Sequence, residues 1–238
     1  MRNTWLIAGK EFRSHLTSPM AYVVVGIFLL LTGFFFTNYL TSTGLADTSI
    51  RGFVEPGAVL LLLFASILTM RLMAEEKKLG TWELLLTAPV RDTEVVLGKF
   101  LGTLGVLVAM LVFTLYYPIL LLILGDPDIG PIIASYLGLF LVGNAALAIG
   151  LFASSLTSNQ IVAAVVSGAI LFGLWFVGLA ASYMAPAIGR VITYISLSSY
   201  FGNFVVGLID TRAIVYYLSV TALFLFLTIR SLETSRWN

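Results

Sequence analysis

Long apolar segments separated by short polar stretches dominate the pattern of this 238-residue chain. A helix needs about 20 mostly apolar residues to cross the hydrocarbon layer of a bilayer, which is about 30 Å thick. The segments that meet this requirement are residues 20–40, 54–73, 95–124, 131–154, 161–184 and 213–229. The pattern therefore predicts an all-α integral membrane protein with six transmembrane helices, forming a single membrane domain over residues 1–238.

Prolines mark two helix boundaries within this pattern. The third segment is longer than one crossing needs, and Tyr116-Tyr117-Pro118 predicts a bend there or its emergence into the interface, because proline removes a helical hydrogen bond. Pro131 is placed as a proline in the first turn of the fourth helix.

Two further segments differ from the six spans. Residues 1–19 carry Trp5, Phe12 and Leu16 at helical spacing, with charges elsewhere around the helix, which predicts an amphipathic helix in the membrane surface. Residues 191–209 carry no charge but are diluted by serine, threonine, asparagine and glycine. We expect short interfacial or re-entrant helices within an outer segment, 185–212, and the alternative is a seventh span.

Composition agrees with a lipid environment. The chain is 59% hydrophobic and 11% charged, with a mean hydropathy of +1.02, whereas soluble domains are nearer half apolar and a quarter charged. A net charge of +1 does not favour a nucleic-acid partner. The absence of cysteine excludes disulfides and thiolate chemistry, and a single histidine, His15, cannot form a zinc site alone.

The distribution of cations predicts the orientation of the chain in an inner or plasma membrane. If both termini are cytoplasmic, Arg51, Arg190 and Arg212 are the only cations outside. The cations that then lie inside are Arg2, Lys10, Arg13, Arg71, Lys77, Lys78, Arg91, Lys99, Arg230 and Arg236.

The spans hold no ionisable residue near a helix midpoint, which disfavours an ion-coupled carrier, an intramembrane protease and a proton pump. Thr37 and Asn38 are candidate substrate contacts, although hydrogen bonding between helices is the ordinary interpretation of such residues. Gly98 and Gly102 form a GxxxG pattern, which indicates close helix packing. Lys99 follows Gly98, but the rest of the P-loop pattern is missing, so nucleotide hydrolysis would require another polypeptide.

The longest polar excursion, residues 71–99, contains an apolar cluster. We expect the second span to continue through Lys78 and to stop at Gly80, with a short helix over 82–87 that Thr81 caps and Pro89 ends. Asp92 or Thr93 should cap the next span. The short helix gathers Trp82, Leu84, Leu85 and Leu86. This cluster either docks a partner or packs back against the membrane face.

The run A-E-E-K-K-L-G-T-W-E-L-L-L-T-A-P-V-R, followed by V-L-G-K-F, resembles the signature of type-2 ATP-binding-cassette (ABC-2) permeases. The chain is particularly similar to the branch of the gliding-motility permease subunit, and the likeness covers essentially its whole length. That branch often has a histidine before the aromatic residue of its last loop, where this chain has Ser199-Tyr200-Phe201.

The resemblance implies a permease that dimerises with a second copy or a related chain and is not itself an enzyme. Residues 1–19 would be the connecting helix, and the loop 74–92 would carry a coupling helix that docks on a cytoplasmic ATPase subunit, which binds ATP and magnesium. Glu83 would pair with a basic group on the ATPase or on the connecting helix, and a solvated charge is the alternative. The implied ATPase-coupling residues are Gly80, Thr81, Trp82, Glu83, Leu84, Leu85, Leu86, Pro89 and Arg91.

We therefore expect the permease subunit of an ATP-driven exporter in contact with membrane lipid. The alternative is a membrane interaction protein that transmits ATPase-driven motion to an extracytoplasmic partner without moving a solute. A secondary carrier is a third, less favoured hypothesis.

Overall fold

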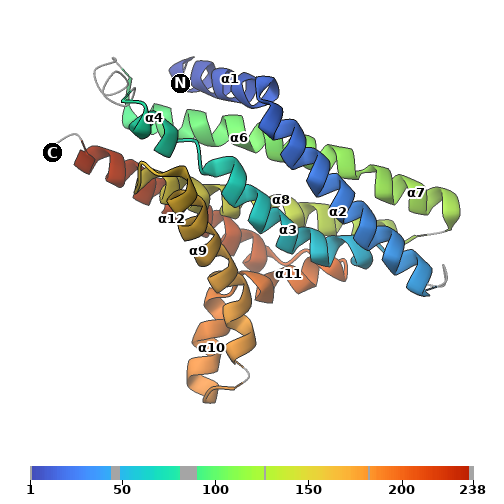
Figure 1. The fold of residues 1–238 in the computed structure, drawn as a ribbon. Helices are drawn as coiled ribbons and strands as arrows, with labels where there is room; N and C mark the ends of the chain where they lie inside the picture. The colour runs from blue at the N-terminus through green and yellow to red at the C-terminus, as the bar shows by residue number, and fades with distance from the viewer. Residues whose placement is uncertain (1, 44–48, 81–89, 126, 182, 236–238) are drawn as a thin grey trace.

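The computed structural model describes residues 2–43, 49–80, 90–125, 127–181 and 183–235, and every regular element in them is a helix (Figure 1). In chain order these are α1 (Arg2–Thr17), α2 (Pro19–Thr43), α3 (Arg51–Thr69), α4 (Ala74–Lys78), α6 (Asp92–Thr114), α7 (Tyr116–Leu124), α8 (Ile129–Ser155), α9 (Gln160–Ala181), α10 (Pro186–Ile195), α11 (Leu197–Val205) and α12 (Thr211–Ser235).

The described residues contain six helical stretches long and apolar enough to cross a membrane, which confirms the predicted number. They are Pro19–Thr43, Arg51–Lys78, Asp92–Ile123, Ile129–Ser155, Gln160–Ala181 and Thr211–Thr234. Each overlaps one predicted segment, and the boundaries differ by a few residues. The start of α1, α4 and the end of α12 lie at the same end of the bundle, which we call the loop end (Figure 1).

Helix α8 forms the centre of the bundle. It packs against α3, α6, α9, α11 and α12, and most of its length is buried, whereas α2, α9 and α12 are largely exposed. Small residues allow these close contacts: a Cβ on Gly150 would lie 2.0 Å from Thr69 Oγ1, and one on Gly138 would lie 2.8 Å from Phe204 Cβ. The exposed outer helices present apolar surface, as expected of helices that face lipid.

The second span is interrupted, contrary to the prediction of a helix continuous through Lys78. Helix α3 ends at Thr69, residues 70–73 form a turn, and α4 begins at Ala74. Ser154 of α8 bonds the broken backbone, because its hydroxyl accepts from the N–H groups of Met73 and Ala74 and donates to the carbonyl of Met70, each at 3.1 Å. A residue on a distant helix therefore stabilises the break.

The predicted bend before Pro118 is confirmed. Helix α6 ends at Thr114 and α7 starts at Tyr116, with Leu115 between them. The phenol of Tyr117 donates to the carbonyl of Leu29 at 2.9 Å and lies 3.0 Å from Thr32 Oγ1. The bend is thus anchored to α2. Pro131 lies in the first turn of α8, as predicted.

Residues 186–205 form two short helices, and none of the six membrane-length helices of the described chain lies there. Helix α10 turns back along α9, since a Cβ on Gly189 would lie 2.8 Å from the carbonyl oxygen of Ala181. At the start of α11, Ser198 donates to the carbonyl of Trp175 at 2.7 Å, six residues before the end of α9. Because each helical residue rises about 1.5 Å, the six residues from Ala181 back to Trp175 mean that α10 carries the chain about 9 Å back along α9. The segment is a helical hairpin beside α9, and its re-entrant placement in the membrane stays a prediction.

Candidate functional site

The described part of the loop end is organised around a buried lysine. Lys99 of α6 is only 3% exposed, and its Nζ lies 2.8 Å from Glu76 Oε1 of α4 and 3.5 Å from Glu11 Oε2 of α1. These three residues, here called the Lys99 cluster, join the two described helices that flank the loop, α4 and α6, to the distant helix α1. Breaking a fully buried ion pair costs about 3–5 kcal/mol, and the partial exposure of Glu11 and Glu76 makes this an upper bound for the cluster.

Helix α1 reaches this cluster because glycines of α6 leave room for it. A Cβ on Gly98 would lie 2.7 Å from the Cβ of Ile7, and one on Gly102 would lie 2.6 Å from the Cβ of Glu11. The predicted close packing at the GxxxG pattern is confirmed, and its partner is the N-terminal helix. On the other side of α1, Trp5 is 71% and Leu16 45% exposed, so an apolar face remains available to the membrane surface.

The starts of α1 and α6 are also tied together. Arg91 is the N-cap of α6, which corrects the expected cap at Asp92 or Thr93. The reason is Glu94, whose Oε2 accepts from the backbone N–H of Arg91 at 3.3 Å, as an N3 glutamate does. Asn3 of α1 donates to the same oxygen at 3.2 Å. Arg91 thus marks the point where the loop rejoins the bundle.

A small polar group lies beside the Lys99 cluster. His15 and Arg71 line a cavity of about 30 Å³ between α1, α2 and the end of the second span. His15 Nε2 and Arg71 Nε are buried and have no hydrogen-bond partner within the described chain. Burial lowers the pKa of His15, Lys99 and Arg71 lower it further, and Glu11 opposes them. The imidazole is therefore favoured in its neutral form.

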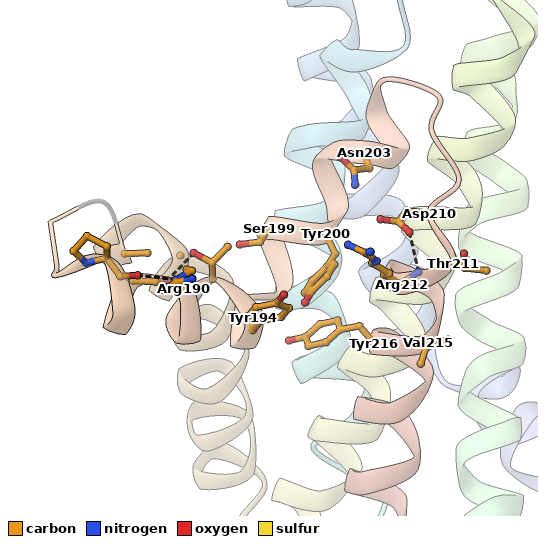
Figure 2. Close-up of a pocket in the computed structure, with 15 residues that line it drawn as sticks. Arg190, Tyr194, Ser199, Tyr200, Asn203, Asp210, Thr211, Arg212, Val215 and Tyr216 are labelled. Carbon is orange, nitrogen blue, oxygen red and sulfur yellow. Dashed lines mark hydrogen bonds between the residues drawn. The ribbon is translucent and has the colours of Figure 1, made fainter.

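At the opposite ends of α9 and α12 lies a much larger cavity, of about 1280 Å³ (Figure 2). We call it the α9–α12 cavity. The residues that line it are Gly178, Ala181, Pro186, Gly189, Arg190, Thr193, Tyr194, Ser199, Tyr200, Asn203, Asp210, Thr211, Arg212, Val215 and Tyr216. Its walls are formed by the end of α9, the hairpin of α10 and α11, and the start of α12.

Aromatic contacts fix one wall of this cavity. The rings of Tyr200 and Tyr216 stack with centroids 4.3 Å apart, and the phenol of Tyr216 donates to the carbonyl of Ile195. Burial raises the pKa of Tyr200, with Tyr194 and Asp210 adding to the effect and Arg212 opposing it. Tyr200 therefore remains a protonated phenol at neutral pH.

Thr37 and Asn38 do not join either cavity. Both lie on the exposed side of α2, and the Thr37 hydroxyl donates to the carbonyl of Gly33 in its own helix at 3.0 Å. Their role as substrate contacts stays a prediction.

A family model described as "ABC-2 family transporter protein" matches residues 47–230. The chain belongs to the ABC-2 transporter family. It is 34% identical over 185 residues to "Probable multidrug ABC transporter permease YbhS" of Escherichia coli strain K12, and equally to the protein of that name from strain O157:H7. The alignment covers 73% of this chain and 47% of each relative, so the chain spans about half the length of the curated relatives it matches.

In this ABC-2 chain, most of the expected coupling segment, Thr81 to Pro89, lies outside the described residues. Its flanks are described. Helix α4 ends at Lys78, and Gly80 has a φ of +70°, a left-handed conformation that favours glycine after a helix. The predicted stop at Gly80 is confirmed, while the coupling roles of all the loop residues stay predictions.

Sequence reasoning missed the two best-defined features of this ABC-2 protein. Lys99 was assigned to the cytoplasmic charges, although it lies inside the predicted third span, where a lysine needs a buried partner. A lysine inside a predicted apolar span is therefore a signal in the sequence that points to a buried ion pair. The sequence signal for the α9–α12 cavity is weaker. It is the cluster of tyrosine, arginine and polar residues in a segment too polar to span a membrane.

Proposed function

We propose that this chain is the membrane-spanning permease subunit of an ATP-driven exporter. It would pair with a second copy or a related permease, with both termini in the cytoplasm, and receive force from a separate ATPase subunit that binds ATP and magnesium. Family membership and the six membrane-length helices support this proposal. The sequence also has no P-loop, so the energy source would be another chain.

The observation that carries the proposal is the Lys99 cluster. The described helices on either side of loop 79–91 are α4 and α6, and Lys99 joins them to each other and, through Glu11, to α1. A force applied to the loop would therefore move three helices together. Ser154 and the bond from Lys77 Nζ to the carbonyl of Ser155 extend this connection to α8 at the centre.

The proposed docking surface is the apolar part of the loop, with Leu84, Leu85 and Leu86 inserted into the ATPase and Glu83 paired with one of its basic groups. Co-purification of the chain with its candidate ATPase tests this. Glu83→Ala combined with Leu85→Asp should abolish ATPase binding. Unchanged binding would show that the loop is not the coupling element.

A second experiment separates docking from force transmission. Lys99→Met should retain ATPase binding but lose ATP-driven export in proteoliposomes, because the loop would remain while its connection to α1 and α4 weakens. Glu233→Gln is the matched control, since it breaks the exposed Arg230–Glu233 pair at the same end of the molecule. Export by Lys99→Met at the control's rate would exclude the cluster from coupling.

We propose an apolar or amphiphilic cargo. The matched Escherichia coli relatives carry "multidrug" in their names, and the buried polar groups of the described spans are mostly hydroxyls rather than charges. ATP-dependent uptake of lipophilic dyes by inside-out vesicles that contain the permease and its ATPase measures this. Transport that follows an ion gradient and ignores ATP would contradict the exporter.

A further inference from the structure

The α9–α12 cavity lies at the depth where membrane spans end. It extends from Gly178 and Ala181, the last turn of the span Gln160–Ala181, to Thr211 and Arg212, the first residues of the span Thr211–Thr234. Such positions coincide with the lipid headgroup layer, whichever side of the membrane this end faces. Lipid headgroups are therefore the most concentrated ligands at the cavity.

Two arginines line the cavity without being neutralised. Within the described chain, neither Arg190 nor Arg212 forms an ion pair with a carboxylate. Arg190 Nε donates to the carbonyl of Pro186 at 3.3 Å. The nearby carboxylate, Asp210, caps α12 by accepting from the backbone N–H of Arg212 at 2.9 Å. Guanidinium N–H donors thus remain available for an anionic ligand.

The remaining wall suits an amphiphile better than a small anion. Figure 2 shows Tyr200 and Tyr216 between Arg190 and Arg212, so the stacked rings separate the two cationic sides. Val215, 60% exposed, adds aliphatic surface along α12. A volume of about 1280 Å³ also exceeds what a free phosphate would fill. Tyrosine beside aliphatic surface and arginine is the usual chemistry of a membrane interface.

We propose that the α9–α12 cavity binds an anionic phospholipid, with its phosphate at Arg190 or Arg212, on one side of the tyrosine wall, and an acyl chain along Val215 and that wall. This site is separate from the loop end, and its occupancy does not depend on transport or on the ATPase. A single guanidinium group recognises phosphate oxygens in a planar, two-pronged geometry, so each arginine alone suits an anionic headgroup.

Native mass spectrometry of the delipidated full-length chain in detergent tests the site with two probes, phosphatidylglycerol and phosphatidylcholine. The wild type should retain phosphatidylglycerol in preference. Arg190→Gln combined with Arg212→Gln should weaken phosphatidylglycerol binding about thirtyfold, since each of the two arginines contributes roughly 1 kcal/mol near an anionic headgroup. Arg51→Gln is the matched control, because Arg51 is exposed at the start of a span but does not line the cavity, and it should bind as the wild type does.

Two further arms identify the ligand's source. Val215→Gln should weaken lipid binding without affecting the arginines, and millimolar inorganic phosphate should leave bound phosphatidylglycerol in place. Full displacement by phosphate would assign the site to a free anion and overturn the lipid proposal. Equal retention of the two lipids by the wild type would also overturn it, as would an unchanged preference in a folded double-arginine variant. If the double-arginine variant does not fold, the preference of the wild type for phosphatidylglycerol over phosphatidylcholine decides the proposal alone.

Discussion

The two ends of the molecule use charge in opposite ways. At the loop end, Lys99 is buried and paired with two carboxylates from other helices, whereas at the cavity end Arg190 and Arg212 are exposed and have no ion-pair partner within the described chain. Buried pairs fix helices relative to one another, while exposed guanidinium groups keep their donors for a ligand. The comparison contrasts an end whose charges tie helices together with an end whose charges face outward.

The largest expected effect comes from breaking the rigid end at its charge. Lys99→Met leaves the partly exposed carboxylates of Glu11 and Glu76 near each other without their cation. It should lower the free energy of unfolding by up to about 3–5 kcal/mol, the cost of breaking a fully buried pair. Thermal and denaturant unfolding of the purified chain in detergent measure this loss. Restoring neutrality with Glu11→Gln and Glu76→Gln should recover part of it.

Glu233→Gln serves as the control, because its partner Arg230 is exposed and such a surface pair is worth under about 1 kcal/mol. If Lys99→Met were no more destabilising than Glu233→Gln, the Lys99 cluster would not hold the loop end together.

The next effect concerns the packing that brings α1 to the cluster. Gly102→Val places a Cβ 2.9 Å from the carbonyl oxygen of Ala8 and adds two methyl groups, so α1 must move away from α6. We expect a loss of about 1–3 kcal/mol, as for other overpacked contacts, and faster proteolysis at the N-terminus.

Gly26→Ala is the matched glycine substitution, since a Cβ there meets nothing within 4 Å. It should be neutral or slightly stabilising, because alanine favours helix. Equal protease sensitivity of the two variants would mean that α1 does not depend on the glycines of α6.

These contrasts show which parts of the structure a sequence can predict. The six spans depend on about 20 consecutive apolar residues, a strong local signal, and the stop at Gly80 and the break before Pro118 are local as well. The Lys99 cluster and the break at residues 70–73 depend on partners about 80 positions away, Glu11 and Ser154. Nothing in Met70-Arg71-Leu72-Met73 itself opposes a helix, so the tertiary bond from Ser154 decides.

A smaller effect should appear when the pH at the loop end is lowered. Because burial lowers the pKa of His15 in the folded protein, the unfolded chain binds its proton more readily, and protonation favours unfolding. Stability from this residue is therefore complete above the unfolded pKa of about 6.5 and declines as the pH falls below it. The groups that face His15 are Glu11, which opposes this trend, and Lys99 and Arg71, which reinforce it.

Unfolding of the wild type and His15→Gln between pH 7.5 and 5 measures the effect. The wild type should lose stability more steeply than the variant as the pH falls. Parallel curves for the two proteins would show that His15 is not the titrating group.

The smallest effect on stability is expected at the cavity end. It tests most directly whether the charges at the two ends of the molecule have different roles. Arg190→Gln and Arg212→Gln remove cations that form no ion pair in the described chain, so each should change the unfolding free energy by less than about 0.5 kcal/mol in pure detergent. Added phosphatidylglycerol should raise the unfolding temperature of the wild type but not that of the double variant, because a ligand stabilises only a fold that binds it. A large loss of stability without lipid would mean that these arginines hold the fold, as Lys99 does. The two ends would then not differ in the way their charges are used.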